Sequence, residues 1–361
     1  MTAKLAKIIK QKIQEDGPIT VAEFMEIALM HPKFGYYQSA EAFGVKGDFI
    51  TAPEISQMFG ELIGLWCVDS WSKMGAPAKF MLVEFGPGRG TLMSDALRSA
   101  ALVPAFIEAA EIYLIEGSQA LTSTQKQALT NHDIRWCQQL SDLPSGIPAI
   151  FIGNEFLDAL PIQQFERAAD GWREKRIGLS DDGFVFELHS ETIHSNELTL
   201  PKEGTADLGS IYEHSPAARS IIKDLSEYLN RFGGCALFID YGPEASAFGD
   251  SFQSVKNHLF ADPLQNPGAQ DLTAHVDFEA LANIAKAAGC LTPKIATQGR
   301  FLERLGIEAR TLSLSKAAND SQKQKLNADL KRLISSSEMG TLFKALCFHA
   351  KMLETPAGFS E

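Results

Sequence analysis

The 361-residue sequence has few cysteines, no excess of positive charge and no long apolar run. Its five cysteines lie at least 55 residues apart, which excludes paired zinc or redox motifs and predicts free, mostly buried thiols of a cytoplasmic protein. The eight histidines form no ligand pair of the H-E-x-x-H kind, so we expect no metal site. No segment has the ~18 consecutive apolar residues that would predict a membrane span.

The charge balance is acidic, with 45 Asp and Glu against 33 Lys and Arg and a formal net charge of −12. Binding through nucleic-acid phosphates requires clustered basic residues, so we expect no nucleic-acid partner. Four lysines near the N-terminus could belong to a transit peptide, but this stretch lacks arginine and serine. We therefore predict a surface helix there and a bacterial cytoplasmic location, or the mitochondrial matrix for a eukaryotic protein.

The composition, 45% hydrophobic and 22% charged, is that of a globular protein with a sizeable core. From residue 79 onward, short apolar runs alternate with helical patterns, which predicts β-α units and a parallel sheet. The expected strands cover residues 80–85, 112–115, 134–137, 149–152 and 235–239, with a last strand near 342–349. The fold class is therefore α/β.

Two regions differ from this alternation. At the N-terminus, helices are expected over residues 2–15 and 19–30, followed by a long helix that begins with a Thr51–Glu54 capping box. Residues 162–206 instead have the alternation and Asp-Gly turns of antiparallel hairpins. We thus divide the chain into an N-terminal helical lid (1–78), a core (79–161 and 207–361) and an inserted β element (162–206).

A glycine loop follows the first expected strand of the core, in the sequence Glu84-Phe85-Gly86-Pro87-Gly88-Arg89-Gly90. Glycines at a strand-to-helix turn let backbone N–H groups approach a nucleotide closely. The spacing E-x-G-x-G-x-G differs from the G-x-G-x-x-G of dinucleotide sites, and the preceding acid suits a ligand with an amino group rather than a pyrophosphate. A plain glycine turn and a nicotinamide site remain alternatives.

Two further residues follow neighbouring strands. Glu116 ends the second strand, where a carboxylate can accept hydrogen bonds from both hydroxyls of a ribose. Gln139 follows the third strand, where an adenine would lie in such a fold. The alternatives are a solvated charge at the strand end for Glu116 and a surface glutamine for Gln139.

The segment from Asn154 to Pro161 follows the fourth strand directly. Glu155 and Asp158 are three residues apart, so on a helical turn both carboxylates would face the same way and could hold a guanidinium group. The alternative is that Asn154 or Asp158 only caps a helix. Further on, His275 is either a base or a structural residue before a helix that Asp277 caps.

These segments together resemble the MidA-like family of class I S-adenosylmethionine-dependent methyltransferases, whose mitochondrial members are arginine methyltransferases acting in complex I assembly. The segments that carry the resemblance are Ala28–Pro32 with Gly35–Tyr37, Gly47–Ser56, Gly86–Gly90, Asn154–Pro161, Ile239–Gly242 and Asp271–Phe278. It implies a Rossmann-like seven-stranded core, S-adenosylmethionine as cofactor, and symmetric dimethylation of an arginine in a subunit of the respiratory NADH:quinone oxidoreductase or another protein.

On this hypothesis the cofactor residues are Thr51, Glu84, Gly86, Gly88, Gly90, Glu116, Gln139 and Asn154, and the catalytic residues are Glu155 and Asp158. The N–H groups at the helix start after Thr51 would bind the methionine carboxylate. A binding-only assembly factor that keeps the methyltransferase fold is one alternative function. An NAD-dependent oxidoreductase is the other.

Overall fold

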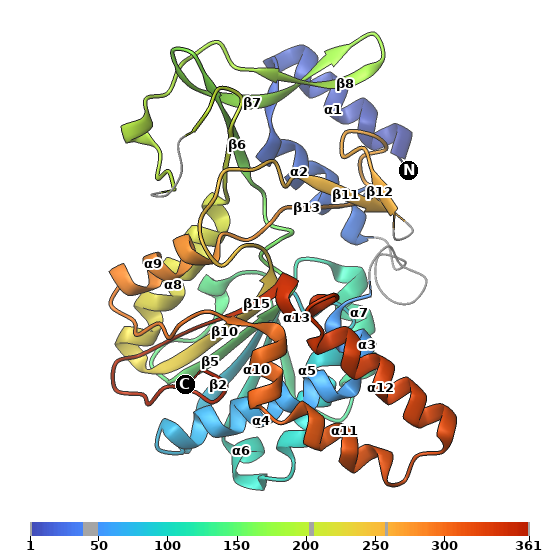
Figure 1. The fold of residues 1–361 in the computed structure, drawn as a ribbon, viewed down its shortest axis with the longest axis vertical. Coiled ribbons are helices and arrows are strands. Elements are labelled where there is room, and N and C mark those ends of the chain that lie inside the picture. The colour runs from blue at the N-terminus through green and yellow to red at the C-terminus, as the bar shows by residue number, and fades with distance from the viewer. Residues whose placement is uncertain (1, 39–49, 202–205, 257–258, 360–361) are drawn as a thin grey trace.

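A computed structural model describes residues 2–38, 50–201, 206–256 and 259–359. Within this part of the chain, no helix is long and apolar enough to cross a membrane. The molecule has two lobes (Figure 1), which we call the core lobe and the cap lobe. The core lobe is the seven-stranded sheet with its flanking helices. The cap lobe is formed by three chain segments, 2–38, 162–214 and 251–275.

The core sheet has the strand order β14-β15-β10-β5-β2-β3-β4. The five strands β10, β5, β2, β3 and β4 are parallel to one another. β15 is antiparallel to both of its neighbours, β14 and β10. The bounds are β2 (Phe80–Phe85), β3 (Ala110–Ile115), β4 (Ile134–Cys137), β5 (Ala149–Asn154), β10 (Gly234–Tyr241), β14 (Ala296–Thr297) and β15 (Phe343–His349). The predicted α/β class and seven-stranded sheet are confirmed.

Helices cover both faces of this sheet and bury two apolar clusters. One face carries α4 (Gln57–Lys73), α5 (Thr91–Ala100), α6 (Pro104–Ala109), α10 (Gln298–Arg304), α11 (Ile307–Ser315) and α12 (Asp320–Ile334). The other carries α8 (Pro216–Phe232) and α9 (Phe278–Ala287), and α7 (Gln119–Ala128) links β3 to β4. The predicted Asp277 cap of α9 is confirmed, whereas α11 was not foreseen.

The cap lobe is built around an apolar cluster that residues of all three segments share, and a second, smaller cluster contains Phe165, Trp172 and Tyr212. It contains α1 (Thr2–Asp16), β1 (Ile19–Thr20), α2 (Val21–Met30), β6 (Gln163–Ala168), β7 (Gly171–Ser180), β8 (Gly183–Leu188) and β9 (Ile211–His214). β1 pairs with β7, so the N-terminal segment and the inserted β element form a single sheet. The helix predicted over residues 2–15 is confirmed as α1, and a Thr20–Glu23 capping box begins α2.

A small second sheet completes the cap lobe, in the order β12-β11-β13. Its strands are β11 (Gln253–Lys256), β12 (Leu259–Ala261) and β13 (Asp271–Thr273). They lie in the stretch after β10 that the sequence showed only as rich in turns. The cap lobe thus covers the edge of the core sheet at which the parallel strands end (Figure 1).

The helix expected to begin at Thr51 differs from the prediction. Thr51 makes no capping hydrogen bond through its side chain, and the chain forms only the single turn α3 (Ala52–Ile55). Ser56 then adopts extended backbone and caps α4, which packs on the core sheet rather than with the N-terminal helices. The capping box and the single long helix were therefore wrong. Residues 47–49 of the segment Gly47–Ser56 lie outside the described residues.

Candidate functional site

A cavity of about 610 Å³ lies at the carboxyl edge of the parallel strands, under the cap lobe. The core lobe contributes the ends of β2, β3 and β5 and the turn after β4. The cap lobe contributes Met30, Tyr37, Gln253, Phe260 and Asp271. Ligands of open α/β sheets bind at this edge, so the cavity is the candidate functional site.

The glycine loop forms part of the cavity floor, as its sequence predicted. Gly86, Gly88 and Gly90 have φ values of +58°, +53° and +84°, in the left-handed region that favours glycine. A Cβ atom on Gly86 would lie 2.9 Å from the ring of Phe156, so no larger residue fits there. Gly86 and Gly88 line the cavity, while Gly90 caps α5 and packs beside Gln125.

A second cavity, of about 40 Å³, lies on the other side of the glycine loop and is lined by Glu84, Asn154, Glu155 and Thr51 among others. Glu84 is only 2% exposed, and burial raises the pKa of its carboxyl to about 8. Within the described part of the chain, neither Glu84 Oε2 nor Asn154 Oδ1 has a hydrogen-bond partner. Two buried acceptors without donors fit a ligand that brings an ammonium group.

Glu116 is held in place at the end of β3 before any ligand arrives. Its carboxylate accepts hydrogen bonds from the Ser118 backbone N–H (2.7 Å) and from Gln125 Nε2 (2.9 Å). Burial raises the pKa of this carboxyl above its usual value. Gln139 lies at the same cavity but is exposed, and it begins a short 3₁₀ turn with Asp142.

The segment after β5 does not form the helical turn that the i, i+3 spacing predicted. Glu155 has φ +50°, and residues 155–161 follow as bends and turns. Asp240 of β10 explains this course, because its Oδ2 accepts the N–H groups of Phe156, Leu157 and Asp158 at 3.1, 2.8 and 3.2 Å. The prediction of a helical turn was wrong, and so was the alternative in which Asn154 or Asp158 caps a helix.

Glu155 and Asp158 nevertheless line the same cavity. Burial raises the pKa of Glu155 to about 7, and Arg332 partly offsets this rise. Burial also raises the pKa of Asp158 well above its usual value, and the negative charges of Asp240, Asp271 and Glu155 add to the effect. The two carboxylates thus belong to a buried acidic cluster, which favours a cationic ligand.

Glu155 also joins the two sides of the cavity. Its Oε1 accepts hydrogen bonds from the Ala52 N–H (2.8 Å) and from Asn154 Nδ2 (2.9 Å). Ala52 is the first residue of the one-turn helix α3. The N–H group that the sequence analysis assigned to the methionine carboxylate is therefore bonded to Glu155, while Thr51 itself lines both cavities.

Three cavity residues were missed by sequence reasoning: Tyr37, Tyr241 and Asp271. The Tyr37 hydroxyl donates a hydrogen bond to Asp271 Oδ1 at 2.9 Å. The Tyr241 hydroxyl bonds with Thr273 Oγ1 and accepts from Gln253 Nε2. All three belong to segments that carry the family resemblance, but no spacing rule pointed to their chemistry.

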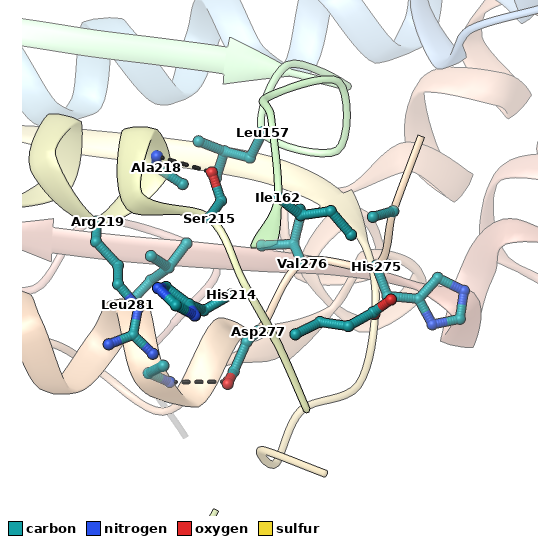
Figure 2. A pocket seen from close by; sticks show the side chains of 13 residues that line it. Leu157, Ile162, His214, Ser215, Ala218, Arg219, His275, Val276, Asp277 and Leu281 are labelled. Carbon is teal, nitrogen blue, oxygen red and sulfur yellow. Dashed lines mark hydrogen bonds between the residues drawn. The ribbon is translucent and has the colours of Figure 1, made fainter. Parts of the chain in front are cut away.

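His275 lies between the main cavity and a small one of about 30 Å³. Figure 2 shows its imidazole directed away from His214 and Arg219, which line the small cavity. The His275 ring meets the Tyr241 ring edge to face, with centroids 5.3 Å apart. Desolvation, together with the charge of Lys344, lowers the pKa of His275. A neutral imidazole beside Tyr241 fits either of the two roles weighed for this residue.

The sequence and the fold both match known proteins. The sequence model of a family of S-adenosyl-L-methionine-dependent methyltransferases matches residues 62–296. The Caenorhabditis elegans protein named "Protein arginine methyltransferase NDUFAF7 homolog, mitochondrial" is 36% identical, over 99% of this chain and 91% of its own length. The human protein named "Protein arginine methyltransferase NDUFAF7, mitochondrial" is 35% identical, over 94% of this chain and 82% of its own length.

Among solved structures, a crystal structure of a Burkholderia thailandensis protein bound to S-adenosyl-homocysteine superposes with a TM-score of 0.85. The two proteins share 27% sequence identity, and the match covers 99% of this chain and 94% of the other. A native crystal structure of a protein from the same organism gives a TM-score of 0.83. The likeness therefore includes the cap lobe as well as the core lobe.

Proposed function

The chain belongs to the family of S-adenosyl-L-methionine-dependent methyltransferases, and from this premise we propose that it methylates an arginine side chain of a protein. The family fixes the cofactor as S-adenosylmethionine. The curated relatives are named protein arginine methyltransferases, which supports the choice of acceptor. The observation in this molecule that carries the proposal is the acidic cluster at the cavity, because the charges acting on Asp158 are all negative.

The residues present fit the cofactor. Glu84 and Asn154, whose buried oxygens lack donors in the described part of the chain, would accept hydrogen bonds from its amino group. Gly86 and Gly88 leave room for close approach to the backbone, and Glu116 would accept from both ribose hydroxyls. Gln139 is proposed to lie beside the adenine. When bound, the cofactor supplies a methyl group on a positively charged sulfur atom.

The acceptor would lie on the acidic side of the cavity. Asp158 and Glu155 would hold the guanidinium group through charge-assisted hydrogen bonds and orient one nitrogen toward the glycine loop. Methylation of that nitrogen releases one proton. A carboxylate whose pKa is raised to about 7, as that of Glu155 is, can accept this proton and return it to water near neutral pH.

The finer statements stay predictions of the family resemblance. These are the symmetric dimethylated product, a subunit of the respiratory NADH:quinone oxidoreductase as substrate, and a bacterial cytoplasmic location; the curated relatives are named mitochondrial. The division into lid, core and inserted element is likewise a proposal. The shared apolar cluster favours treating the N-terminal helices, the inserted hairpins and residues 251–275 as one unit.

The test is methyl transfer by the purified full-length protein from isotopically labelled S-adenosylmethionine to peptides. We expect label in arginine peptides and none in matched peptides with lysine in place of arginine. Glu155→Gln and Asp158→Asn should lower transfer by at least ~100-fold, while calorimetry shows cofactor affinity within about twofold of wild type. Glu227→Gln, on the exposed face of α8, is the control variant.

The results also separate the alternative functions. A protein that binds S-adenosylmethionine but labels no arginine peptide would support a binding-only assembly factor. The same conclusion would follow if Glu155→Gln and Asp158→Asn retained every cellular role. Preferential binding of NAD in the same calorimetric titration would support the oxidoreductase alternative.

A further inference from the structure

Several apolar side chains that line the main cavity, or lie next to one that does, are exposed to solvent. Leu259 and Phe260, adjacent on β12, are 72% and 82% exposed, and Phe260 lines the cavity. Met30 of α2 and Leu342, which directly precedes β15, are half-exposed and line it too. Isolated exposed leucines are common on protein surfaces, but several large apolar side chains around one cavity mark an interaction site. We call these four residues the apolar rim.

The backbone of β12 offers a second kind of contact. Among the described residues, β12 is the edge strand of the sheet β12-β11-β13 and pairs only with β11, through Ser254↔Ala261, Val255↔Phe260 and Lys256↔Leu259. This sheet lies in the cap lobe (Figure 1), where β13 packs against α2. Exposed edge strands usually carry charged residues or proline that prevent pairing with other chains. The two exposed side chains at the start of β12 are instead Leu and Phe.

We propose that the apolar rim and the free edge of β12 form the docking surface for an extended segment of the protein substrate, with an apolar residue within two positions of the acceptor arginine. This inference rests on the proposed function. Charge complementarity supports it, because the acidic cluster with Glu155 and Asp158 lies inside the cavity that the apolar rim adjoins. A segment that carries one cation and a neighbouring apolar side chain matches both parts.

The geometry of an added strand sets the distance between these two side chains. Residues two apart on a strand point to the same face and lie about 6–7 Å from each other. The arginine would enter the cavity while the residue two positions away packs on Phe260, which lines the same cavity. Backbone hydrogen bonds to β12 would then supply affinity that does not depend on sequence, and the rim would supply selectivity.

The experiment uses the full-length protein and synthetic glycine-serine peptides that carry one arginine, with Phe, Leu or Ser placed two residues away. For the wild type, we expect Phe or Leu to raise kcat/KM about tenfold over Ser, the effect of burying one large apolar side chain. In Phe260→Ser, the ratio of kcat/KM for the Phe peptide to that for the Ser peptide should fall below about twofold. Leu259→Ser, at the adjacent position that faces the other side of the strand, should keep the wild-type ratio.

Leu102→Ser and Leu208→Ser are matched controls, because these leucines are 79% and 72% exposed and lie away from the cavity. Unchanged calorimetric affinity for S-adenosylmethionine will show that each variant is folded. An apolar preference that survives in Phe260→Ser overturns the inference and leaves the proposed function standing. Failure of every arginine peptide overturns the proposed function itself.

The other occupant of this surface would be a second copy of the chain. Size-exclusion chromatography with light scattering distinguishes it from a substrate segment. A wild-type dimer that Leu259→Ser converts to a monomer would assign the edge of β12 to self-association and overturn the inference. An unchanged oligomeric state, together with the lost apolar preference, supports it.

Discussion

The core lobe and the cap lobe are built in different ways. In the core lobe, β2, β3 and β4 follow one another in the chain and pair with each other, whereas β5 and β10 join them through longer connections. The cap lobe brings residues of three chain segments together around a shared apolar cluster, and β6, β7 and β9 bury a second, smaller one. Its sheet depends on the pairing of β1 with β7, which are more than 150 residues apart.

The two lobes also differ in what they contribute to the cavity. The candidate cofactor residues Glu84, Gly86, Gly88 and Glu116 all lie on the core lobe. Tyr37 and Asp271 of the cap lobe lie beside Asp158, where we place the acceptor. If this division holds, substitutions of these four core residues will change cofactor binding. Substitutions of Tyr37 and Asp271 will change acceptor binding, as will those of Glu155 and Asp158 of the core lobe. The predictions below test this division, starting with Asp240, which holds the turn that carries Glu155 and Asp158.

Asp240→Ala is expected to have the largest effect, because it removes the oxygen that accepts three backbone N–H groups of the turn carrying Glu155 and Asp158. Leaving these buried donors unpaired should lower the free energy of unfolding by about 3 kcal/mol or more. Urea denaturation measures this change, and methyl transfer should be lost as well. Asp240→Asn, which keeps one acceptor oxygen, should be milder. An Asp240→Ala protein with wild-type stability would contradict this role.

Glu116→Ala tests the core lobe alone. The loss of hydrogen bonds to an ionised acceptor should weaken S-adenosylmethionine binding by about 10–100-fold, whereas KM for an arginine peptide stays within about twofold. Calorimetry and steady-state kinetics measure the two quantities. Glu111→Ala, at the amino end of the same strand and paired with Lys79, is the control. Equal losses in cofactor and peptide affinity would break the division between the lobes.

The pH dependence of methyl transfer tests the acidic cluster. Burial raises the pKa of Glu155 to about 7, so this carboxyl is neutral below that pH and cannot bind a cation. With a pKa of about 7, the ionised fraction falls from about one half at pH 7 to about one tenth at pH 6, so kcat/KM for an arginine peptide should fall about fivefold over this range. In Glu155→Gln, kcat/KM should be lower at every pH, and this decrease between pH 7 and pH 6 should be absent. A flat wild-type profile would count against the role of Glu155.

Tyr37→Phe should give the smallest effect and tests the cap lobe alone. The substitution keeps the ring but removes the hydroxyl that bonds Asp271 at 2.9 Å. Loss of one hydrogen bond should raise KM for the peptide by about 2–10-fold and leave cofactor affinity unchanged. Tyr228→Phe, whose hydroxyl bonds Ile147 O outside the cavity, is the control. A larger change in cofactor affinity than in KM for the peptide would show that Tyr37 acts in cofactor binding and would contradict the division.

The contrast between the lobes also explains what the sequence could predict. The core strands are buried on both faces and appear as continuous apolar runs, so their positions and the glycine loop follow from local pattern. The hairpins of β6, β7 and β8 also follow from local pattern and are confirmed. β1 has only two residues, and its partner is distant in sequence, so no local pattern could reveal that the N-terminal segment joins this sheet. Ligands of open α/β sheets generally bind at the carboxyl ends of the strands, so Glu84 and Glu116 could be assigned to the site from their positions in the predicted strands.

The acceptor side was harder to predict for a related reason. The spacing of Glu155 and Asp158 suggested a helical turn, but the conformation is set by Asp240, more than 80 residues away. The positive φ of Glu155 is unusual for a residue with a side chain and has no sequence signal. Tyr37 and Asp271 meet only because two segments of the cap lobe fold over the core. Such juxtapositions depend on tertiary structure.

The acidic cluster links the binding of a cation in the cavity to the release of protons. Its buried carboxyls have raised pKa values, so at neutral pH some of them carry a proton when no cation is bound. A guanidinium ion that enters must displace these protons into solvent. Acceptor binding and proton release are therefore one event, and the heat of binding should vary with the ionisation enthalpy of the buffer.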